Sequence, residues 1–210
     1  DLIYMVVETQ NLKDVLKEFG HKELQAKKIV IIGGGNIGLS LSELIEKNET
    51  SISTELIEAD KERAKFLASQ LNNVTVTNGD GLDNQILDEV NISEAGYCIA
   101  VTEDDEVNIL SSLLAKRAGS EQCMTLINNT SYTSLLSNIG IDITIDPKII
   151  TISKILEKVR GGGIMNDYSI GDGFGEVIEA MIKKQSPLCN KNLRDLKLPK
   201  GIRIASIFRN

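Results

Sequence analysis

Short apolar runs and stretches of helical periodicity alternate along most of the chain. The apolar runs, each typical of a buried strand, cover 28–32, 53–58, 74–77, 97–101, 123–127 and 141–145. The intervening segments, with apolar residues at helical spacing, cover 36–47, 61–71, 83–89, 104–117 and 131–138. Repeated strand–helix units predict a parallel sheet with helices on both faces. The fold class expected for residues 27–146 is therefore α/β, a doubly wound Rossmann-type sheet.

Two of the predicted helices carry boundary signals. Asp60 is expected to cap the helix that starts at residue 61. The helix over 104–117 begins with acidic residues and ends with basic ones, as the helix dipole favours, and Gly119 follows it.

The pattern changes after residue 146. Pro147 is expected to open a helix that runs to Arg160, and Gly161–Gly163 would follow as a flexible break. Further elements are predicted beyond this hinge: strands at 164–170, 175–184 and 201–208, and a turn with a short helix at 188–196. Together they predict a small α+β unit over 164–210 that reads as partial.

The opening residues are interpreted as the end of another domain. Residues 2–7 read as a strand, and residues 11–19 have apolar positions at helical spacing. The chain starts inside an apolar run and without methionine. We therefore expect it to be a piece of a longer protein.

Composition excludes several classes of protein. The net charge of −7 offers no basic footprint for nucleic acid or for an anionic lipid surface. The cysteines, Cys98, Cys123 and Cys189, lie far apart in sequence, and the only histidine, His21, is remote from all of them. Neither a zinc site nor a disulfide framework is expected, and reduced, buried thiols in a cytosolic protein are the simpler interpretation.

A glycine motif follows the first strand of the repeat and opens the next helix. The residues read GGGNIG, with glycines at Gly33, Gly35 and Gly38. In a dinucleotide-binding fold the first glycine permits a tight turn, the second lets the backbone approach a pyrophosphate, and the third lets the helix pack close to the strand. The free N–H groups at the start of the helix would point at the phosphates.

Glu58 ends the second strand, 20 positions after Gly38. That spacing and place are expected for the acid that binds a ribose. A carboxylate there accepts hydrogen bonds from ribose hydroxyls and repels a 2′-phosphate, which favours NAD(H) over NADP(H). ATP or ADP, whose ribose hydroxyls are also free, would suit it too.

Two more residues follow later strands, where the carboxyl ends of a parallel sheet face the ligand crevice. Asp80 comes after the third strand and would either contact the adenine side or cap the helix at 83. Thr102 comes after the fourth strand and is a candidate for lining the pocket, whereas the acids at 103–105 are typical of a helix start.

The residues that a nucleotide-transforming enzyme needs are missing from the sequence. A dehydrogenase places an acid or base beside the hydride path, yet His21 precedes the Rossmann unit and no tyrosine has a lysine four positions later. No GxxxxGK[ST] loop for phosphoryl transfer occurs. The pattern indicates a protein that binds a nucleotide without transforming it.

Several longer stretches resemble the RCK (or KTN) domain of bacterial potassium-transport regulators. The stretches are GGGNIG with ELIEAD, then NGDG, then AVTEDDEVNILSSLLAKRAG. The segment from Phe174 to Asn210 resembles the family's ligand-sensing carboxyl-terminal subdomain. The resemblance implies the second half of a tandem protein, with four parts: the tail of a preceding RCK subdomain at 1–23, the Rossmann domain at 27–146, a crossover helix and hinge at 147–163, and a partial carboxyl-terminal subdomain at 164–210.

The same resemblance implies a cytoplasmic regulatory subunit at the inner face of the cell membrane. It would bind NAD or NADH, with ATP or ADP as alternatives, and control a membrane potassium-translocating subunit. The family's nucleotide-site positions fall on Gly33, Gly35, Asn36, Ile37, Glu58, Asp80 and Thr102. Asn36 stands where some relatives carry an arginine that binds phosphates, and its neutral side chain favours NAD(H) over ATP. The alternative function is an NAD-dependent oxidoreductase whose substrate domain is absent from this chain.

The helix expected at 147–160 has a broad apolar surface. One stripe recurs at helical spacing, and two further isoleucines widen it: Ile149, Ile152, Leu156 and Val159, then Ile150 and Ile155. Such breadth predicts a contact between subunits or with the first tandem half, as the crossover helix of RCK pairs implies. The alternative is that the small carboxyl-terminal unit covers the extra face.

Overall fold

The computed structural model describes residues 26–49, 51–160, 164–170, 175–183, 185–189, 191–196 and 198–207, with a few isolated positions before them. Most of the strand and helix expected at 2–7 and 11–19, the lone histidine and the break at 161–163 lie outside the described residues. The chain divides into two compact units. One unit is Leu24–Ile150, and the other joins Thr151–Asn210 with Asp1–Glu23.

The unit Leu24–Ile150 contains a six-stranded sheet in which all neighbouring strands run parallel. Its strand order is β3-β2-β1-β4-β5-β6. The strands are β1 Lys28–Ile32, β2 Ser53–Glu58, β3 Val74–Asn78, β4 Tyr97–Ala100, β5 Gln122–Leu126 and β6 Ile143–Ile145. This is the strand order of a full Rossmann fold, with two halves that meet between β1 and β4, and it confirms the expected fold class.

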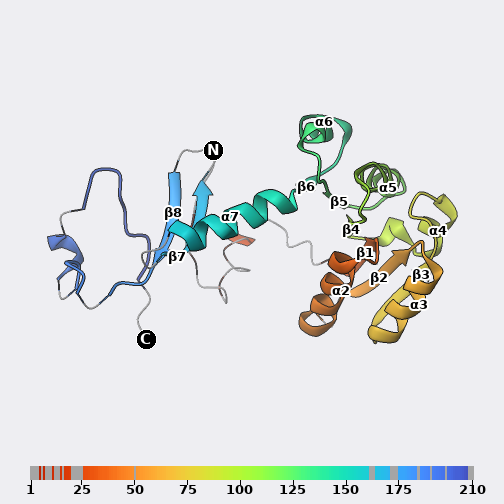
Figure 1. Ribbon diagram of the computed structural model, residues 1–210, viewed down its shortest axis with the longest axis horizontal. Helices are drawn as coiled ribbons and strands as arrows, with labels where there is room; N and C mark the ends of the chain where they lie inside the picture. The colour runs from red at the N-terminus through yellow and green to blue at the C-terminus, as the bar shows by residue number, and fades with distance from the viewer. Residues whose placement is uncertain are drawn as a thin grey trace. The chain divides into compact units, whose positions relative to one another are not determined.

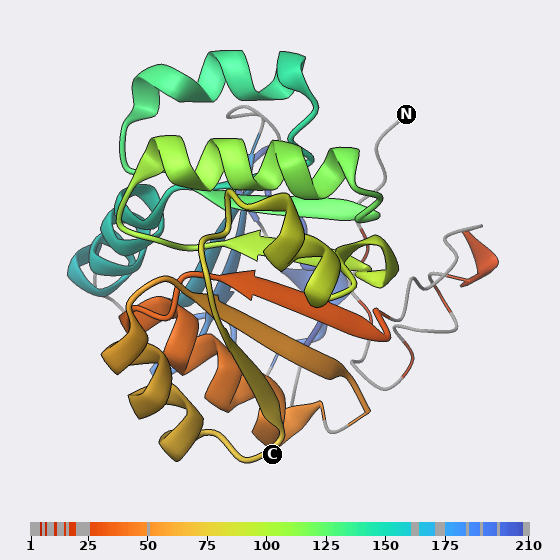
Figure 2. The ribbon, with the colours of Figure 1, turned by 90° about the vertical axis from the view of Figure 1, so that its right-hand side faces the viewer.

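Helices cover both faces of this sheet (Figures 1 and 2). They are α2 Asn36–Asn48, α3 Lys61–Gln70, α4 Asn84–Glu89, α5 Asp105–Arg117 and α6 Thr133–Ile139, with short 3-10 turns at Ile92–Glu94 and Thr130–Tyr132. Figure 2 shows α2 and α3 on one side of the sheet and α5 and α6 on the other. Crossovers between parallel strands are right-handed. From the central strands, the chain adds β2 and β3 on one side and β5 and β6 on the other, so the helices of the two halves lie on opposite faces of the sheet.

Two apolar cores lie on the two faces, and β1 contributes to both. Its residues Val30 and Ile32 pack with the core that includes Leu87 of α4 and Ala115 of α5. Its other residues, Ile29 and Ile31, pack with the core that includes Leu67 of α3. A central parallel strand is buried on both faces, which is why KIVII reads as a continuous apolar run rather than an alternating one.

Lys28, the one charged residue of β1, is nevertheless buried. Its ammonium lies 2.9 Å from the Glu55 carboxylate of the neighbouring strand β2. Pairing makes this burial tolerable, because an unpaired charge would pay the full cost of desolvation.

Side-chain caps fix several helix starts, partly as expected. Asp60 accepts a hydrogen bond from Arg63 N–H at 2.6 Å, which confirms it as the cap of α3. Asp104 caps α5 in the same way through Val107 N–H at 2.9 Å. At α4 the cap is Asp83, which accepts from Gln85 N–H at 2.8 Å, so the suggestion that Asp80 caps this helix is wrong.

The other unit contains most of helix α7 Pro147–Arg160, which begins as expected, and the antiparallel strands β7 Ile164–Ile170 and β8 Gly175–Ala180. The 3-10 turn Leu193–Asp195 follows. Two predictions are corrected: β8 ends before residue 184, and residues 202–207 form no strand. An alternating sequence becomes a strand only where a partner strand supplies hydrogen bonds, and the described sheet here has two strands, β7 and β8.

Candidate nucleotide-binding site

The loop between β1 and α2 needs glycine at two of the predicted positions. Gly33 has a φ of +104°, and a Cβ there would lie 2.8 Å from the backbone nitrogen of Thr102. A Cβ at Gly38 would lie 1.9 Å from the carbonyl oxygen of Gly33. The expected tight turn and the close packing of helix on strand are both present.

Gly35 differs from these two glycines. A Cβ at this position would meet nothing within 4 Å, so no protein contact demands glycine here. Gly35 precedes α2 with extended backbone, and no side chain caps the helix. The first N–H groups of α2 therefore remain available to a ligand, as an anion-binding helix start requires.

Gly34, for which the sequence predicts no role, is held from both sides. Its N–H donates to Glu58 Oε2 at 2.8 Å, and its carbonyl oxygen accepts from Arg63 Nε at 2.8 Å. A Cβ on Gly34 would lie 2.2 Å from Leu67 Cδ1. The middle glycine thus links the glycine loop to β2 and α3, and Arg63 joins the site although no motif spacing pointed to it.

Glu58 is half-buried at the end of β2. Its second carboxylate oxygen, Oε1, accepts from Asp60 N–H at 2.8 Å. The Asn78 side chain donates to the carbonyl oxygens of Glu58 and Ala59 at 2.9 and 3.0 Å, which joins the ends of β2 and β3. Each carboxylate oxygen has two lone pairs, so Glu58 retains acceptor capacity beyond the bonds that orient it.

The remaining predicted site residues lie around the same edge of the sheet. Asp80 is exposed after β3, and its Oδ1 accepts from Leu82 N–H at 2.9 Å, which stabilises the turn. Thr102 follows β4 and contacts the Gly33 position. Asn36 and Ile37 are exposed in the first turn of α2. Contact of these residues with a nucleotide stays a prediction.

The structure brings these segments together where the strand order reverses. β1 pairs with β4, while β2 and β5 lie on opposite sides of that pair. The loops after β1, β2 and β4 therefore meet at one edge, which is where open α/β sheets bind ligands.

An acidic hollow of about 490 Å³ lies beside this edge. Its lining residues are Glu103, Asp104, Asp105, Glu106, Asn128, Asn129 and Tyr132. Asp105 is buried, and its carboxylate accepts from the N–H groups of Asn128 and Asn129 at 2.7 to 3.0 Å, so it holds the loop after β5. The hydrogen bond from Tyr132 to Glu106 raises the pKa of the tyrosine phenol. These interactions shape the hollow, and within the described residues no cluster of side chains fits a metal ion.

Cys98 and Cys123 are register partners on β4 and β5, and both are buried. The neighbouring Cys123 thiol and burial raise the pKa of Cys98. Cys123 Sγ donates to the carbonyl oxygen of Ser112 at 3.2 Å. The expectation of burial is confirmed for these two cysteines, whereas Cys189 is half-buried.

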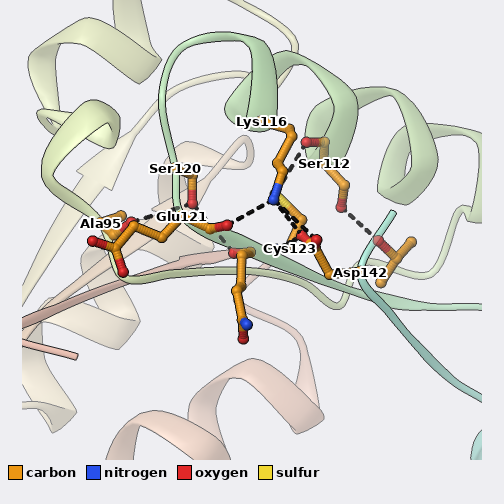
Figure 3. A network of polar contacts seen from close by, with 9 residues as sticks. Ala95, Ser112, Lys116, Ser120, Glu121, Cys123 and Asp142 are labelled. Carbon is orange, nitrogen blue, oxygen red and sulfur yellow. Dashed lines mark hydrogen bonds and ion pairs between the residues drawn. The ribbon is translucent and has the colours of Figure 1, made fainter. Parts of the chain in front are cut away.

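A polar network beside Cys123 ties α5 to β5 and to the residue before β6 (Figure 3). Lys116 Nζ donates to Asp142 at 2.8 Å and to the carbonyl oxygen of Glu121 at 2.6 Å. Asp142 also accepts from Cys123 N–H at 2.7 Å. Partial burial works against ionisation, but the Lys116 and Cys123 hydrogen bonds hold the pKa of Asp142 below its ordinary value. This network is structural, because its members stabilise the second half of the sheet.

The sequence is similar to a known domain family and to potassium uptake proteins. The TrkA-N domain model matches residues 29–147. The Trk system potassium uptake protein TrkA of Azorhizobium caulinodans is 41% identical over 210 residues, which are 100% of this chain and 46% of that protein. The chain thus spans about half the length of this relative.

Solved structures agree on the fold. The GsuK channel bound to NAD superposes with a TM-score of 0.57 at 16% identity, over 78% of this chain and 33% of the other. GsuK bound to ADP superposes with a TM-score of 0.53 at 19% identity, over 74% of this chain and 44% of the other. None of the described helices has the length and apolar character needed to cross a membrane. Because the domain model covers more than half of the sequence, from residue 29 to residue 147, the chain belongs to the TrkA-N domain family.

Proposed function

We propose that this chain is a regulatory module that binds NAD or NADH at the carboxyl edge of β1, β2 and β4. The observation that carries the proposal is the uncapped start of α2 beside Gly35, where a Cβ would meet only open space. A pyrophosphate placed there would accept hydrogen bonds from the first N–H groups of α2 and gain from the helix dipole.

The adenosine ribose would then reach Glu58. The carboxylate is oriented by Gly34 and Asp60 N–H groups, so its position does not depend on the ligand. A fixed carboxylate accepts from the 2′- and 3′-hydroxyls and repels a 2′-phosphate. This selectivity supports NAD(H) over NADP(H). The proposed ligand-contacting positions are Gly33, Gly35, Asn36, Ile37, Gly38, Glu58, Asp80 and Thr102.

ATP and ADP are the competing ligands. They are considered because GsuK, which has a similar fold, has been solved bound to ADP. Two features of this chain favour a dinucleotide. Asn36 brings no positive charge to the start of α2. The sheet also has a complete second half, β4 to β6. In a Rossmann fold each half takes one nucleoside of a dinucleotide, so this second half suits the second nucleoside of NAD(H), which ATP and ADP lack.

The proposed partner is a membrane potassium-translocating subunit, which the chain would contact from the cytoplasmic side. Support comes from the TrkA potassium uptake protein of Azorhizobium caulinodans, whose similarity extends over the whole chain. Nucleotide occupancy would shift the arrangement of paired domains, and the partner would respond to that shift. Pairing with a second copy, or with another half of a tandem protein, would supply the movable interface.

Calorimetric titration with NAD, NADH, ATP and ADP tests the nucleotide part of the proposal. We expect saturable binding with one site per chain and a tighter complex with NAD or NADH than with ATP. Absence of binding to all four nucleotides would contradict the proposal. Tighter binding of ATP would identify ATP, rather than NAD or NADH, as the ligand.

A further inference from the structure

Asn108 is a fully buried side chain on the second turn of α5, and every one of its amide atoms is engaged. Its Oδ1 accepts from Thr102 N–H at 2.8 Å and from Thr102 Oγ1 at 2.7 Å. Its Nδ2 donates to the carbonyl oxygens of Thr102 and Leu126, both at 3.0 Å. A single side chain therefore holds three polar groups of Thr102 and joins the ends of β4 and β5.

These bonds place Thr102 against the glycine loop. A Cβ on Gly33 would lie 2.8 Å from both the backbone nitrogen and Cγ2 of Thr102, so the two segments are in close contact. The contact lies between the ends of β1 and β4, where the strand order of the sheet reverses. Thr102 therefore lies against the glycine loop on the β4 and β5 side of the proposed site.

The other side of the crevice has its own, separate network. Glu58, Gly34 and Arg63 are joined by hydrogen bonds of 2.8 Å, and none of these bonds involves Asn108 or Thr102. A dinucleotide lies across both halves of such a sheet, whereas ADP carries only the adenosine and the pyrophosphate.

We propose that Asn108 is a positioning residue that gives the site its capacity for a dinucleotide, by holding Thr102 in the half of the crevice that takes the second nucleoside. The inference rests on the proposed function. It deepens that function, because it assigns mononucleotide and dinucleotide binding to two separate hydrogen-bond networks.

The chemistry of the amide explains why asparagine is needed. Two donors face Oδ1 and two carbonyl oxygens face Nδ2. Aspartate has no donor when ionised and would oppose the carbonyl oxygens of Thr102 and Leu126 with negative charge. Leucine has a similar volume but would remove all four bonds, although Thr102 Oγ1 has a further hydrogen bond, to the carbonyl oxygen of Asp104 at 3.1 Å.

The test compares wild-type protein with Asn108→Asp and Asn108→Leu, with Ser112→Ala as matched control. Ser112 lies on the same buried face of α5 and accepts a hydrogen bond from Thr125 Oγ1 at 2.7 Å, away from Thr102. We expect both Asn108 variants to bind NADH about tenfold more weakly, or worse, while ADP affinity stays within about threefold. The control should lower thermal stability slightly and keep the ratio of the two affinities.

Amide hydrogen exchange at Thr102 provides a readout that needs no nucleotide. The Thr102 N–H should lose protection in Asn108→Leu, which removes its acceptor, while the Gly34 N–H, bonded to Glu58, keeps it. Equal weakening of ADP and NADH, or unchanged protection of Thr102, would overturn the inference while the proposed function stands. A wild-type protein that binds neither nucleotide would overturn both.

Discussion

The backbone N–H of Gly34 donates a hydrogen bond of 2.8 Å to the Glu58 carboxylate. The residue that would bind the ribose therefore also holds the loop that would bind the phosphates. Arg63 completes the arrangement from α3 by donating to the carbonyl oxygen of Gly34. Because these contacts exist within the protein itself, the two parts of the proposed site are preorganised relative to each other, which lowers the cost of binding.

Replacing Glu58 should change nucleotide selectivity. Glu58→Arg should weaken NADH binding by about tenfold or more and relatively favour NADPH, because a cation there attracts the 2′-phosphate and no longer accepts from the ribose. Fluorescence titration with both nucleotides measures the change. Glu62→Arg, which makes the same charge change at an exposed position on α3, is the control. Unaltered NADH affinity in Glu58→Arg would show that Glu58 does not bind the ribose.

Two adjacent glycines should respond in opposite ways to alanine. Gly34→Ala would bring a Cβ within 2.2 Å of Leu67 Cδ1 and should lower stability by about 1–3 kcal/mol. Gly35→Ala meets no neighbour and has a φ of −64°, so the melting temperature should stay the same or rise slightly. Its methyl group would nevertheless occupy space expected for the pyrophosphate.

Thermal unfolding and calorimetric titration of both variants measure these effects. Gly35→Ala should lose NADH affinity by about tenfold without losing stability. A Gly35→Ala variant that keeps full affinity would place the phosphates elsewhere. A Gly34→Ala variant as stable as the wild type would contradict the packing described for Leu67.

The stability of the fold should depend on Asp142 in a pH-dependent way. Its pKa is below the ordinary value of 3.8, so ionised Asp142 stabilises the folded state at higher pH, and this contribution is lost as the pH falls through the folded-state pKa. Asp142→Asn should lower the free energy of unfolding at pH 7 by about 1 kcal/mol or less, since both partners are about one-third exposed.

Urea unfolding from pH 7 down into the acid range checks this. The difference between wild type and Asp142→Asn should shrink as the pH falls below 3.8. Glu62→Gln is the control, because the pair between Glu62 and Lys65 is highly exposed and should contribute little at any pH. A difference that persists unchanged in acid would mean that Asp142 acts through something other than its charge.

The protein should bind NADH without consuming it. The only histidine precedes the Rossmann unit and no tyrosine has a lysine four positions later, whereas the oxidoreductase alternative requires an acid or base beside the hydride path. A screen of candidate substrates, followed by NADH absorbance, should give no turnover above background. Robust oxidation that depends on a particular substrate would favour the oxidoreductase and remove the regulatory interpretation.

The surface of α7 should mediate self-association. The structure leaves six apolar side chains of this helix between 45% and 73% exposed: Ile149, Ile150, Ile152, Ile155, Leu156 and Val159. Two copies of the chain that pair through this surface should do so symmetrically. Light scattering should show a dimer that Ile152→Asp or Leu156→Asp converts to a monomer.

Lys154→Asp is the control for this experiment, because helical spacing places Lys154 on the opposite side of α7 from the stripe. A wild-type monomer at high concentration would contradict the prediction. A dimer that resists both aspartate substitutions would place the interface on another surface.

The sequence by itself determined the order of elements and the outline of the site. Local periodicity is enough to place strands and helices, and right-handed crossovers then leave few arrangements for a strand–helix repeat. Gly33, Gly38 and Glu58 were recognisable because they stand at fixed offsets from the end of a strand. Gly33 has a positive φ, and a Cβ at Gly38 would collide with the carbonyl oxygen of Gly33, as those predictions require.

Only the tertiary structure decided the contacts between segments that lie far apart in the chain. Arg63 reaches Gly34 across 29 positions, and Asn108 reaches Leu126 across 18, so no local pattern indicates either bond. The same holds for residues 202–207, where an alternating pattern without a partner strand forms no strand. Local sequence sets the conformations that a segment prefers. The hydrogen-bond partners of its polar groups depend on which other segments the fold brings beside it.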